Sequence, residues 1–156
     1  MSESSRQAIS EFLAQKRIAV VGVSRNPKDF NAAMFRALRQ HGYDVVPVNP
    51  AAKEIEGVPC YECLQQIDPP VQAALVMTQP DAAETIVNDC WQAGIKRVWL
   101  YRAGGQGAVS PAAVAFCRQN GISVVPGFCP YMFLENAGWF HRLHGVLMKI
   151  TGAYPS

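Results

Sequence analysis

Two cysteines and two histidines stand at spacings that occur in redox and metal sites. Cys60 and Cys63 form a C-x-x-C motif, and His141 and His144 lie three residues apart. Such a site needs a second cysteine pair, further ligands or a thioredoxin-like strand end beside the motif. The C-x-x-C motif follows Pro59 in a connecting segment, and no carboxylate or thiol accompanies the histidines at a recognisable spacing. We therefore predict neither metal ligands nor catalytic residues here.

The segment GVSRNPKDFN, which begins at Gly22, has the residue types of a phosphate-binding turn. It follows the apolar run 17–23 and leads into a helical pattern that starts at Phe30. A glycine permits a tight turn, and the start of a helix offers free N–H groups to an anion. An ordinary loop with solvated basic side chains is the alternative. The predicted binding residues of this loop are Gly22, Val23, Ser24, Arg25 and Lys28.

This loop departs from the NAD fingerprint G-x-G-x-x-G, because Ser24 and Pro27 stand where glycines are required. An NAD site also needs an acidic residue at the end of the second strand, but that strand is followed by Asn49-Pro50 and then Lys53. A lysine and a neutral amide suit a ribose that bears a phosphate, as in coenzyme A (CoA) or NADP. A solvated Lys53 is the alternative interpretation.

Apolar strands alternate with amphipathic helices along the chain, a pattern typical of a parallel α/β sheet. Gly42, Gly94 and Gly121 each end a helix just before a strand, and Ser110-Pro111 is a typical helix start. We predict a Rossmann-like, doubly wound, parallel five-stranded sheet in the order 3-2-1-4-5, with helices on both faces. The predicted elements are an N-terminal helix at 5–16, strands at 17–23, 44–48, 71–77, 96–101 and 122–125, helices after the first, third and fourth strands, and a C-terminal helix at about 138–150. In the helix after the third strand, Ala83, Ile86, Val87, Cys90 and Trp91 are expected to point inward.

Length and composition limit the class of protein. The chain has 156 residues, of which 49% are hydrophobic and 17% charged, and this predicts a single domain over 1–156. A net charge of +2 predicts no nucleic-acid partner. No segment reads as a signal peptide or membrane span, and an odd number of cysteines, five, fits free thiols. We therefore expect a cytoplasmic protein without a membrane partner.

Several of these motifs resemble the bacterial CoA-binding domain family. They are Val20-Val-Gly-Val-Ser24 with Asn26-Pro27, Val46-Pro-Val-Asn-Pro50, and Gly57 with Tyr61. The similarity continues through Lys96-Arg-Val-Trp-Leu100 and Cys129, so that it covers nearly the whole chain. This family is related to the N-terminal CoA-binding domain of the succinyl-CoA synthetase alpha subunit.

The resemblance implies a role for each loop at the carboxyl ends of the strands. Gly22, Ser24, Arg25 and Lys28 would cradle phosphates; Asn49, Pro50 and Lys53 would hold the adenosine phosphate end; Thr78, Gln79 and Pro80 would flank the nucleotide; and Gly104 and Gly105 would line the pantetheine end. Many similar proteins have Phe-Arg-Pro where this chain has Thr78-Gln79-Pro80, so one expected cationic contact is missing.

Cys129 follows the last predicted strand, where the sulfur end of CoA would reach it. Two interpretations remain open for it: a small buried apolar residue, or a thiol that forms a mixed disulfide with CoA. The predicted function is non-catalytic binding of CoA, free or acylated. The alternatives are an NADP-dependent oxidoreductase and a ligand-free interaction scaffold. A homodimer or an unknown protein partner is compatible with each, since the predicted C-terminal helix is rich in aromatic residues.

Overall fold

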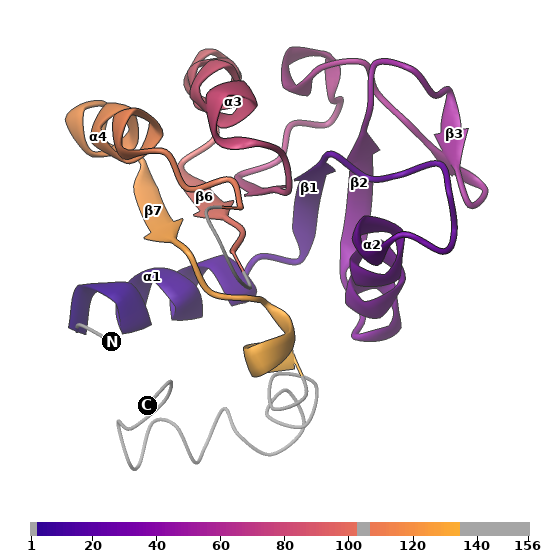
Figure 1. Cartoon of the computed structure of the whole chain (residues 1–156), viewed down its shortest axis with the longest axis horizontal. Helices are drawn as coiled ribbons and strands as arrows, with labels where there is room; N and C mark the ends of the chain where they lie inside the picture. The colour runs from indigo at the N-terminus through magenta and orange to yellow at the C-terminus, as the bar shows by residue number, and fades with distance from the viewer. Residues whose placement is uncertain (1–2, 103–106, 135–156) are drawn as a thin grey trace.

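The computed structural model describes residues 3–102 and 107–134. Within these ranges five strands form one parallel sheet, and two short strands form a separate antiparallel hairpin (Figure 1). The Rossmann-like α/β fold is thereby confirmed. In chain order the elements are α1 (Glu3–Leu13), β1 (Arg17–Val21), α2 (Phe30–Gln40), β2 (Asp44–Val48), β3 (Glu54–Ile55), β4 (Val58–Pro59), the 3-10 helix η1 (Leu64–Gln66), β5 (Ala73–Val76), α3 (Pro80–Gln92), β6 (Arg97–Leu100), α4 (Pro111–Gln119) and β7 (Ser123–Pro126).

The order of the strands corrects the predicted 3-2-1-4-5. The sheet runs β2-β1-β5-β6-β7, which is 2-1-3-4-5 when its strands are numbered along the chain. β5 therefore pairs with β1, with Ala19 opposite Ala74, and not with β2. The connection from β2 to β5 passes through the hairpin and η1, and η1 packs against α3. Because right-handed crossovers on opposite faces lead in opposite directions along a sheet, this connection carries β5 to the far side of β1.

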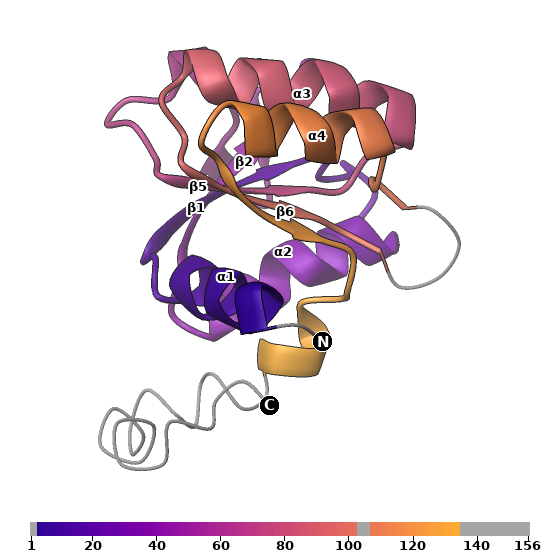
Figure 2. The ribbon, with the colours of Figure 1, turned by 90° about the vertical axis from the view of Figure 1, so that its left-hand side faces the viewer.

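The helices cover both faces of the sheet. Figure 2 shows α1 and α2 on one side of the strands and α3 and α4 on the other. Alternate residues of each strand serve the two layers, as the pleat of a strand requires. Ile18 and Val20 pack with the α1 and α2 layer, whereas Ala19 and Val21 pack with the α3 and α4 layer. The point at which the chain reverses direction along the sheet lies between β1 and β5.

Trp99 of β6 anchors α1 on the sheet. Its side chain is fully buried, and its ring meets the Phe12 ring edge-on, with 5.3 Å between the centroids. The indole Nε1 donates a hydrogen bond to the carbonyl oxygen of Gly127 at 2.9 Å. The indole therefore joins α1, β6 and the end of β7.

The local signals in the sequence have mixed outcomes. The predicted N-terminal helix is present with Ile9, Phe12 and Leu13 buried, although α1 ends at Leu13 and not at 16. The cap at Ser110 is confirmed, since its hydroxyl accepts a hydrogen bond from the Ala113 N–H. The inward placement of Trp91 is wrong. Its side chain is 51% exposed and lies edge-on against Phe116 of α4, so it covers the seam between α3 and α4.

The predicted C-terminal helix at about 138–150 lies outside the described residues. Among the helices that are described, none combines the length and the apolar character needed to cross a membrane.

Candidate functional site

The ends of β1 and β5 meet at Gly22, which adopts the left-handed conformation with φ +96°. A Cβ atom at this position would lie 2.6 Å from the carbonyl oxygen of Met77, so only glycine fits. Asn31 ties the two strand ends together, because its Nδ2 donates to the carbonyl oxygens of Gly22 at 2.9 Å and Met77 at 3.1 Å. The tight turn expected at Gly22 is confirmed. Asn31, whose role sequence reasoning missed, supports it.

The loop between β1 and α2 is held by its own polar side chains. The Ser24 hydroxyl donates a hydrogen bond to the Asp29 carboxylate and accepts one from the Asn26 N–H at 3.0 Å. Asn26 also donates to Asp29 from its side chain and accepts from the Lys28 N–H at 3.1 Å. Ser24 thus has partners within the loop, whereas the side chains of Arg25 and Lys28 are exposed.

Asp29 precedes α2 and was missed by sequence reasoning. It is the N-cap residue, yet its side chain accepts no hydrogen bond from the first turn of the helix. Ser24 and Asn26 hold its carboxylate on the loop side instead. The amides of the first turn are therefore left without a side-chain cap, which is the arrangement that an anion can complete.

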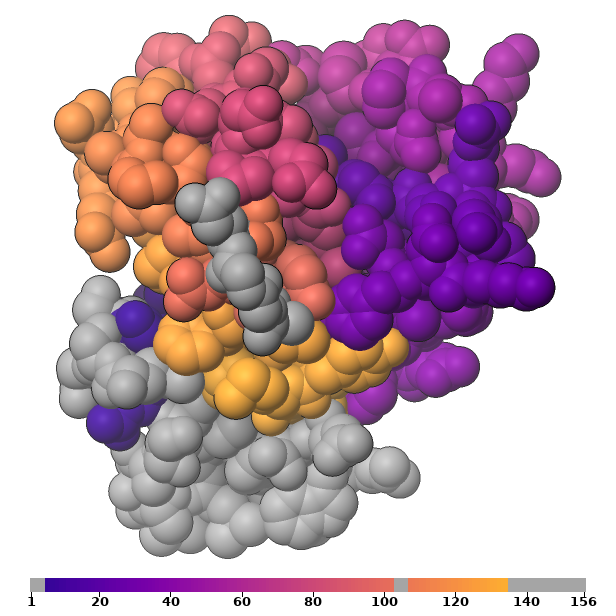
Figure 3. Space-filling view, in the orientation of Figure 1, coloured from indigo at the N-terminus to yellow at the C-terminus, as the bar shows by residue number. Residues whose placement is uncertain are grey.

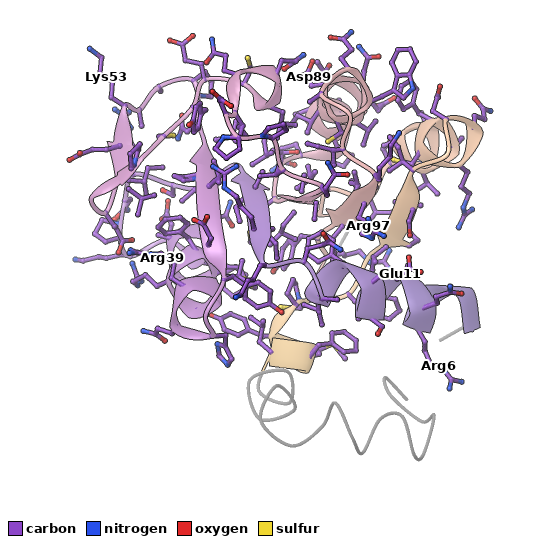
Figure 4. The ribbon with its side chains drawn as sticks, turned by 180° about the vertical axis from the view of Figure 1, so that it is seen from behind. Arg6, Glu11, Arg39, Lys53, Asp89 and Arg97 are labelled. Carbon is purple, nitrogen blue, oxygen red and sulfur yellow. The ribbon has the colours of Figure 1, made fainter. Side chains whose placement is uncertain are left out.

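Asn49 joins the loop after β2 to the loop after β1. Its Nδ2 donates to the Val23 carbonyl oxygen at 2.9 Å, and its Oδ1 accepts from the Ala51 N–H at 2.8 Å. Both ends of the carboxamide are therefore engaged within the protein. Pro50 and Lys53 are exposed, and Figure 4 shows Lys53 pointing away from the body of the molecule beside the β3–β4 hairpin.

The residues after β5 lead directly into α3. Thr78 donates from its hydroxyl to the Gln79 carbonyl oxygen at 3.1 Å, and its methyl group lies 3.2 Å from where a Cβ on Gly22 would be. Gln79 is the N-cap residue of α3 without a side-chain cap bond, and Pro80 is the first residue of the helix. α2 therefore begins after the end of β1, and α3 begins after the end of β5. Both helix starts lie at the β1–β5 junction.

The segment after β7 brings Cys129 to the same edge. Cys129 is half-buried, and burial raises the pKa of its thiol above the ordinary value. Its charge would interact with those of Tyr101, which follows β6, and Tyr131. Figure 3 looks onto this edge, and in it the surface of the residues that follow β1 meets the surface of the residues that follow β7. Gly104 and Gly105 lie outside the described residues.

Phe30, Tyr101 and Tyr131 form an aromatic patch that sequence reasoning missed. The Phe30 ring lies 5.6 Å from each tyrosine ring, measured between centroids. Phe30 begins the predicted helical pattern, and its side chain is 44% exposed. Its position at the first turn of a helix that follows a strand was the available signal, because such a residue lies at the carboxyl edge of the sheet.

The C-x-x-C motif lies beside the loop after β2. The Cys60 thiol is half-buried and donates to the carbonyl oxygens of Asn49 at 3.6 Å and Tyr61 at 3.7 Å. Burial raises the pKa of this thiol above its ordinary value. Over the described ranges, no three side chains of the metal-ligating types gather into a metal site. His141 and His144 fall outside those ranges.

The fold and the arrangement of these loops define a Rossmann-like domain whose candidate ligand edge lies at the switch point between β1 and β5. The chain belongs to the CoA binding domain family, whose sequence profile matches residues 16–135. Family membership supports CoA, a small-molecule nucleotide cofactor, as the ligand.

Two relatives illustrate this membership. The protein YneT of Bacillus subtilis is 28% identical over 130 residues, which are 83% of this chain and 93% of that protein. The alpha subunit of acetate–CoA ligase (ADP-forming) II of Pyrococcus furiosus is 30% identical over 94 residues, which are 60% of this chain. The match spans only 21% of that subunit.

Solved structures show the same fold. A hypothetical protein from Pyrococcus horikoshii OT3 superposes with a TM-score of 0.77 and 27% identity, covering 85% of this chain and 91% of that one. The apo form of a dinucleotide-forming acetyl-coenzyme A synthetase 1 from Ca. Korarchaeum cryptofilum has a TM-score of 0.61 and 28% identity. The match covers 25% of that synthetase chain and 70% of this chain.

Proposed function

We propose that this chain is a non-catalytic binding module for CoA, free or acylated, and that the ligand lies across the carboxyl ends of β1 and β5. The observation that carries the proposal is the junction at Gly22. There a glycine lets the ends of β1 and β5 approach each other closely, and the following helix begins without a side-chain cap. Ligands of open α/β sheets bind at this place in the topology.

The diphosphate of CoA is assigned to the first turn of α2. The N–H groups of a helix start and its dipole favour an anion. Arg25 and Lys28 add two exposed positive charges in the same loop. Asp29 would repel a phosphate, but its bonds to Ser24 and Asn26 keep its carboxylate off the helix end.

The phosphate on the adenosine ribose is assigned to Lys53. The Asn49 carboxamide fixes the loop that leads to Lys53 against the loop after β1. A lysine at the end of an exposed loop reaches a phosphate as a point charge. The names of two matched proteins, an acetate–CoA ligase subunit and an acetyl-coenzyme A synthetase, support CoA over NADP.

A non-catalytic role is supported by the state of the titratable side chains at this edge. The hydroxyls of Tyr101 and Tyr131 and the thiol of Cys129 all have raised pKa values, chiefly because burial disfavours their charged forms. They are therefore neutral at pH 7, and a neutral phenol or thiol is a poor general base or nucleophile.

Calorimetric titration of the reduced, ligand-free protein with CoA, dephospho-CoA, NAD and NADP tests the proposal. We expect CoA to bind most tightly, and Lys53→Ala to weaken CoA binding by about fivefold, as for an exposed ion pair of about 1 kcal/mol. Lys53→Ala should leave dephospho-CoA binding unchanged, because that ligand lacks the phosphate. Lys96→Ala, which removes an exposed lysine at the other end of a strand, should match the wild type.

Two outcomes would contradict the proposal. A preference for NADP over CoA would favour an oxidoreductase. Indifference to all four nucleotides would favour an interaction scaffold.

A further inference from the structure

The aromatic patch of Phe30, Tyr101 and Tyr131 is assembled from three separate segments of the chain. Phe30 is the first residue of α2, Tyr101 follows β6, and Tyr131 follows β7. The planes of the Phe30 and Tyr101 rings are inclined by 34°, and those of Phe30 and Tyr131 by 65°. All three segments reach the carboxyl edge of the sheet, where a ligand of this fold binds.

Phe30 leaves much of its ring in contact with solvent. Its side chain is 44% exposed, whereas the two tyrosines are half-buried. A single exposed apolar side chain is ordinary, but an exposed ring that contacts two others at a ligand edge is a surface that an apolar group can cover. Since Phe30 opens α2 and the two tyrosines follow β6 and β7, the patch extends from the helix start to which the diphosphate is assigned toward the ends of β6 and β7.

The polar groups of the patch itself carry no charge. The tyrosine hydroxyls and the neighbouring Cys129 thiol have raised pKa values and are neutral at pH 7. Arg36, whose charge acts on Tyr131, is engaged by the Glu56 carboxylate at 2.8 Å and by the Pro27 carbonyl oxygen at 3.0 Å. The patch itself therefore offers an uncharged, apolar surface.

We propose that the aromatic patch binds the acyl group of an acyl-CoA and that the site prefers uncharged, apolar acyl groups. This inference rests on the proposed function and adds to it the class of ligand. A diphosphate at the start of α2 directs the opposite end of the molecule, which carries the thioester, along the edge toward β6 and β7. No covalent step is involved, and the acyl group is recognised by apolar contact alone.

The size of the effect follows from the area that an acyl chain can cover. A fully buried methylene group is worth about a factor of four in affinity. On an open patch, a methylene group gains about half of the free energy of full burial, which corresponds to about twofold in affinity per methylene. Hexanoyl-CoA has four more methylenes than acetyl-CoA, so it should bind roughly 16-fold more tightly.

Titration of the full chain with CoA, acetyl-CoA, butanoyl-CoA, hexanoyl-CoA and succinyl-CoA tests this inference. We expect affinity to rise along the saturated series, and succinyl-CoA to bind more weakly than butanoyl-CoA, which has the same number of acyl carbons but no carboxylate. Equal affinities along the series, or a preference for succinyl-CoA, would overturn the inference while leaving CoA binding intact. Failure of every thioester and of CoA itself would overturn the proposed function as well.

Substitutions test whether the dependence of affinity on the acyl group arises from the aromatic patch. Phe30→Ala should reduce the ratio of hexanoyl-CoA to acetyl-CoA affinity from roughly 16-fold to about twofold, because most of the exposed apolar surface is lost. Phe30→Leu should retain more of that ratio than Phe30→Ala. Trp91→Ala is the matched control, since it removes an exposed aromatic ring from the seam between α3 and α4 and should leave the ratio unchanged. An unaltered ratio in Phe30→Ala would show that the acyl group lies elsewhere.

Discussion

Replacing Gly22 by alanine perturbs the junction of β1 and β5 in two ways. The first is conformational, because φ at Gly22 is +96°, a region in which a residue with a Cβ is strained by about 1–3 kcal/mol. The second is steric, because the new Cβ would lie 2.6 Å from the Met77 carbonyl oxygen. Backbone shifts that relieve such an overlap add about 1–3 kcal/mol.

Gly42→Ala separates these two contributions. Gly42 has nearly the same φ, +92°, but a Cβ there would have no heavy atom within 4 Å. Both substitutions also reduce the entropy of the unfolded chain by the same amount, so this effect cancels in the comparison. The difference between the two variants therefore measures the steric term alone.

Urea unfolding of the two variants and the wild type is the assay, with the free energy of unfolding obtained by linear extrapolation. We expect Gly22→Ala to be less stable than Gly42→Ala by about 1–3 kcal/mol. We also expect only Gly22→Ala to weaken CoA binding, because it displaces Met77 and the start of α3 from the ligand edge. Equal stabilities would refute the close approach of β1 to β5, and unchanged CoA binding would refute its role in the site.

Three further predictions concern single contacts. Asn31→Ala removes the two side-chain hydrogen bonds to the Gly22 and Met77 carbonyl oxygens and should lower the free energy of unfolding by about 1–3 kcal/mol in the same urea assay; no loss would mean that the turn holds without it. Ser110→Ala removes the cap of α4 and should lower the free energy of unfolding by about 1 kcal/mol, with CoA titrations unchanged because α4 begins away from the β1–β5 junction. Since burial raises the Cys129 pKa, the thiolate fraction at pH 7 is smaller than in an ordinary thiol and grows as pH rises; iodoacetamide labelling and mixed-disulfide formation at Cys129 should therefore be slow at pH 7 and accelerate above pH 9, and rapid labelling at pH 7 would contradict this.

Much of the fold could be predicted from the sequence because it depends on local patterns. Runs such as RIAVV are apolar on both faces, which predicts a buried parallel strand, and β1 lies there. The serine at 110 and the proline after it predict the start of α4 through the hydrogen bond that a hydroxyl makes to a nearby N–H. Gly22 could be predicted as a tight turn because the conformational freedom of glycine is also a local property.

The order of the strands depended on tertiary structure. Segment 49–72 contains a hairpin and a single 3-10 turn, and its pattern does not say which face of the sheet it crosses. That choice is made by packing of η1 against α3, and it decides that β5 lies beside β1. A contact between distant segments leaves no periodic signal in either of them.

The candidate site, like the fold, could be predicted from the sequence only in part. Residue types alone predicted a turn at Gly22 and a binding role for the basic side chains that follow it, and the resemblance in the Val-Asn-Pro motif pointed to CoA. Only the tertiary structure engaged the Asn49 carboxamide with the loop after β1, turned the Asp29 carboxylate from the helix start, and gathered Phe30 with two tyrosines from other strands. Sequence reports which groups are present and how the backbone nearby can fold. Which of those groups are occupied by partners and which are left open to a ligand is decided by segments that meet only when the sheet forms.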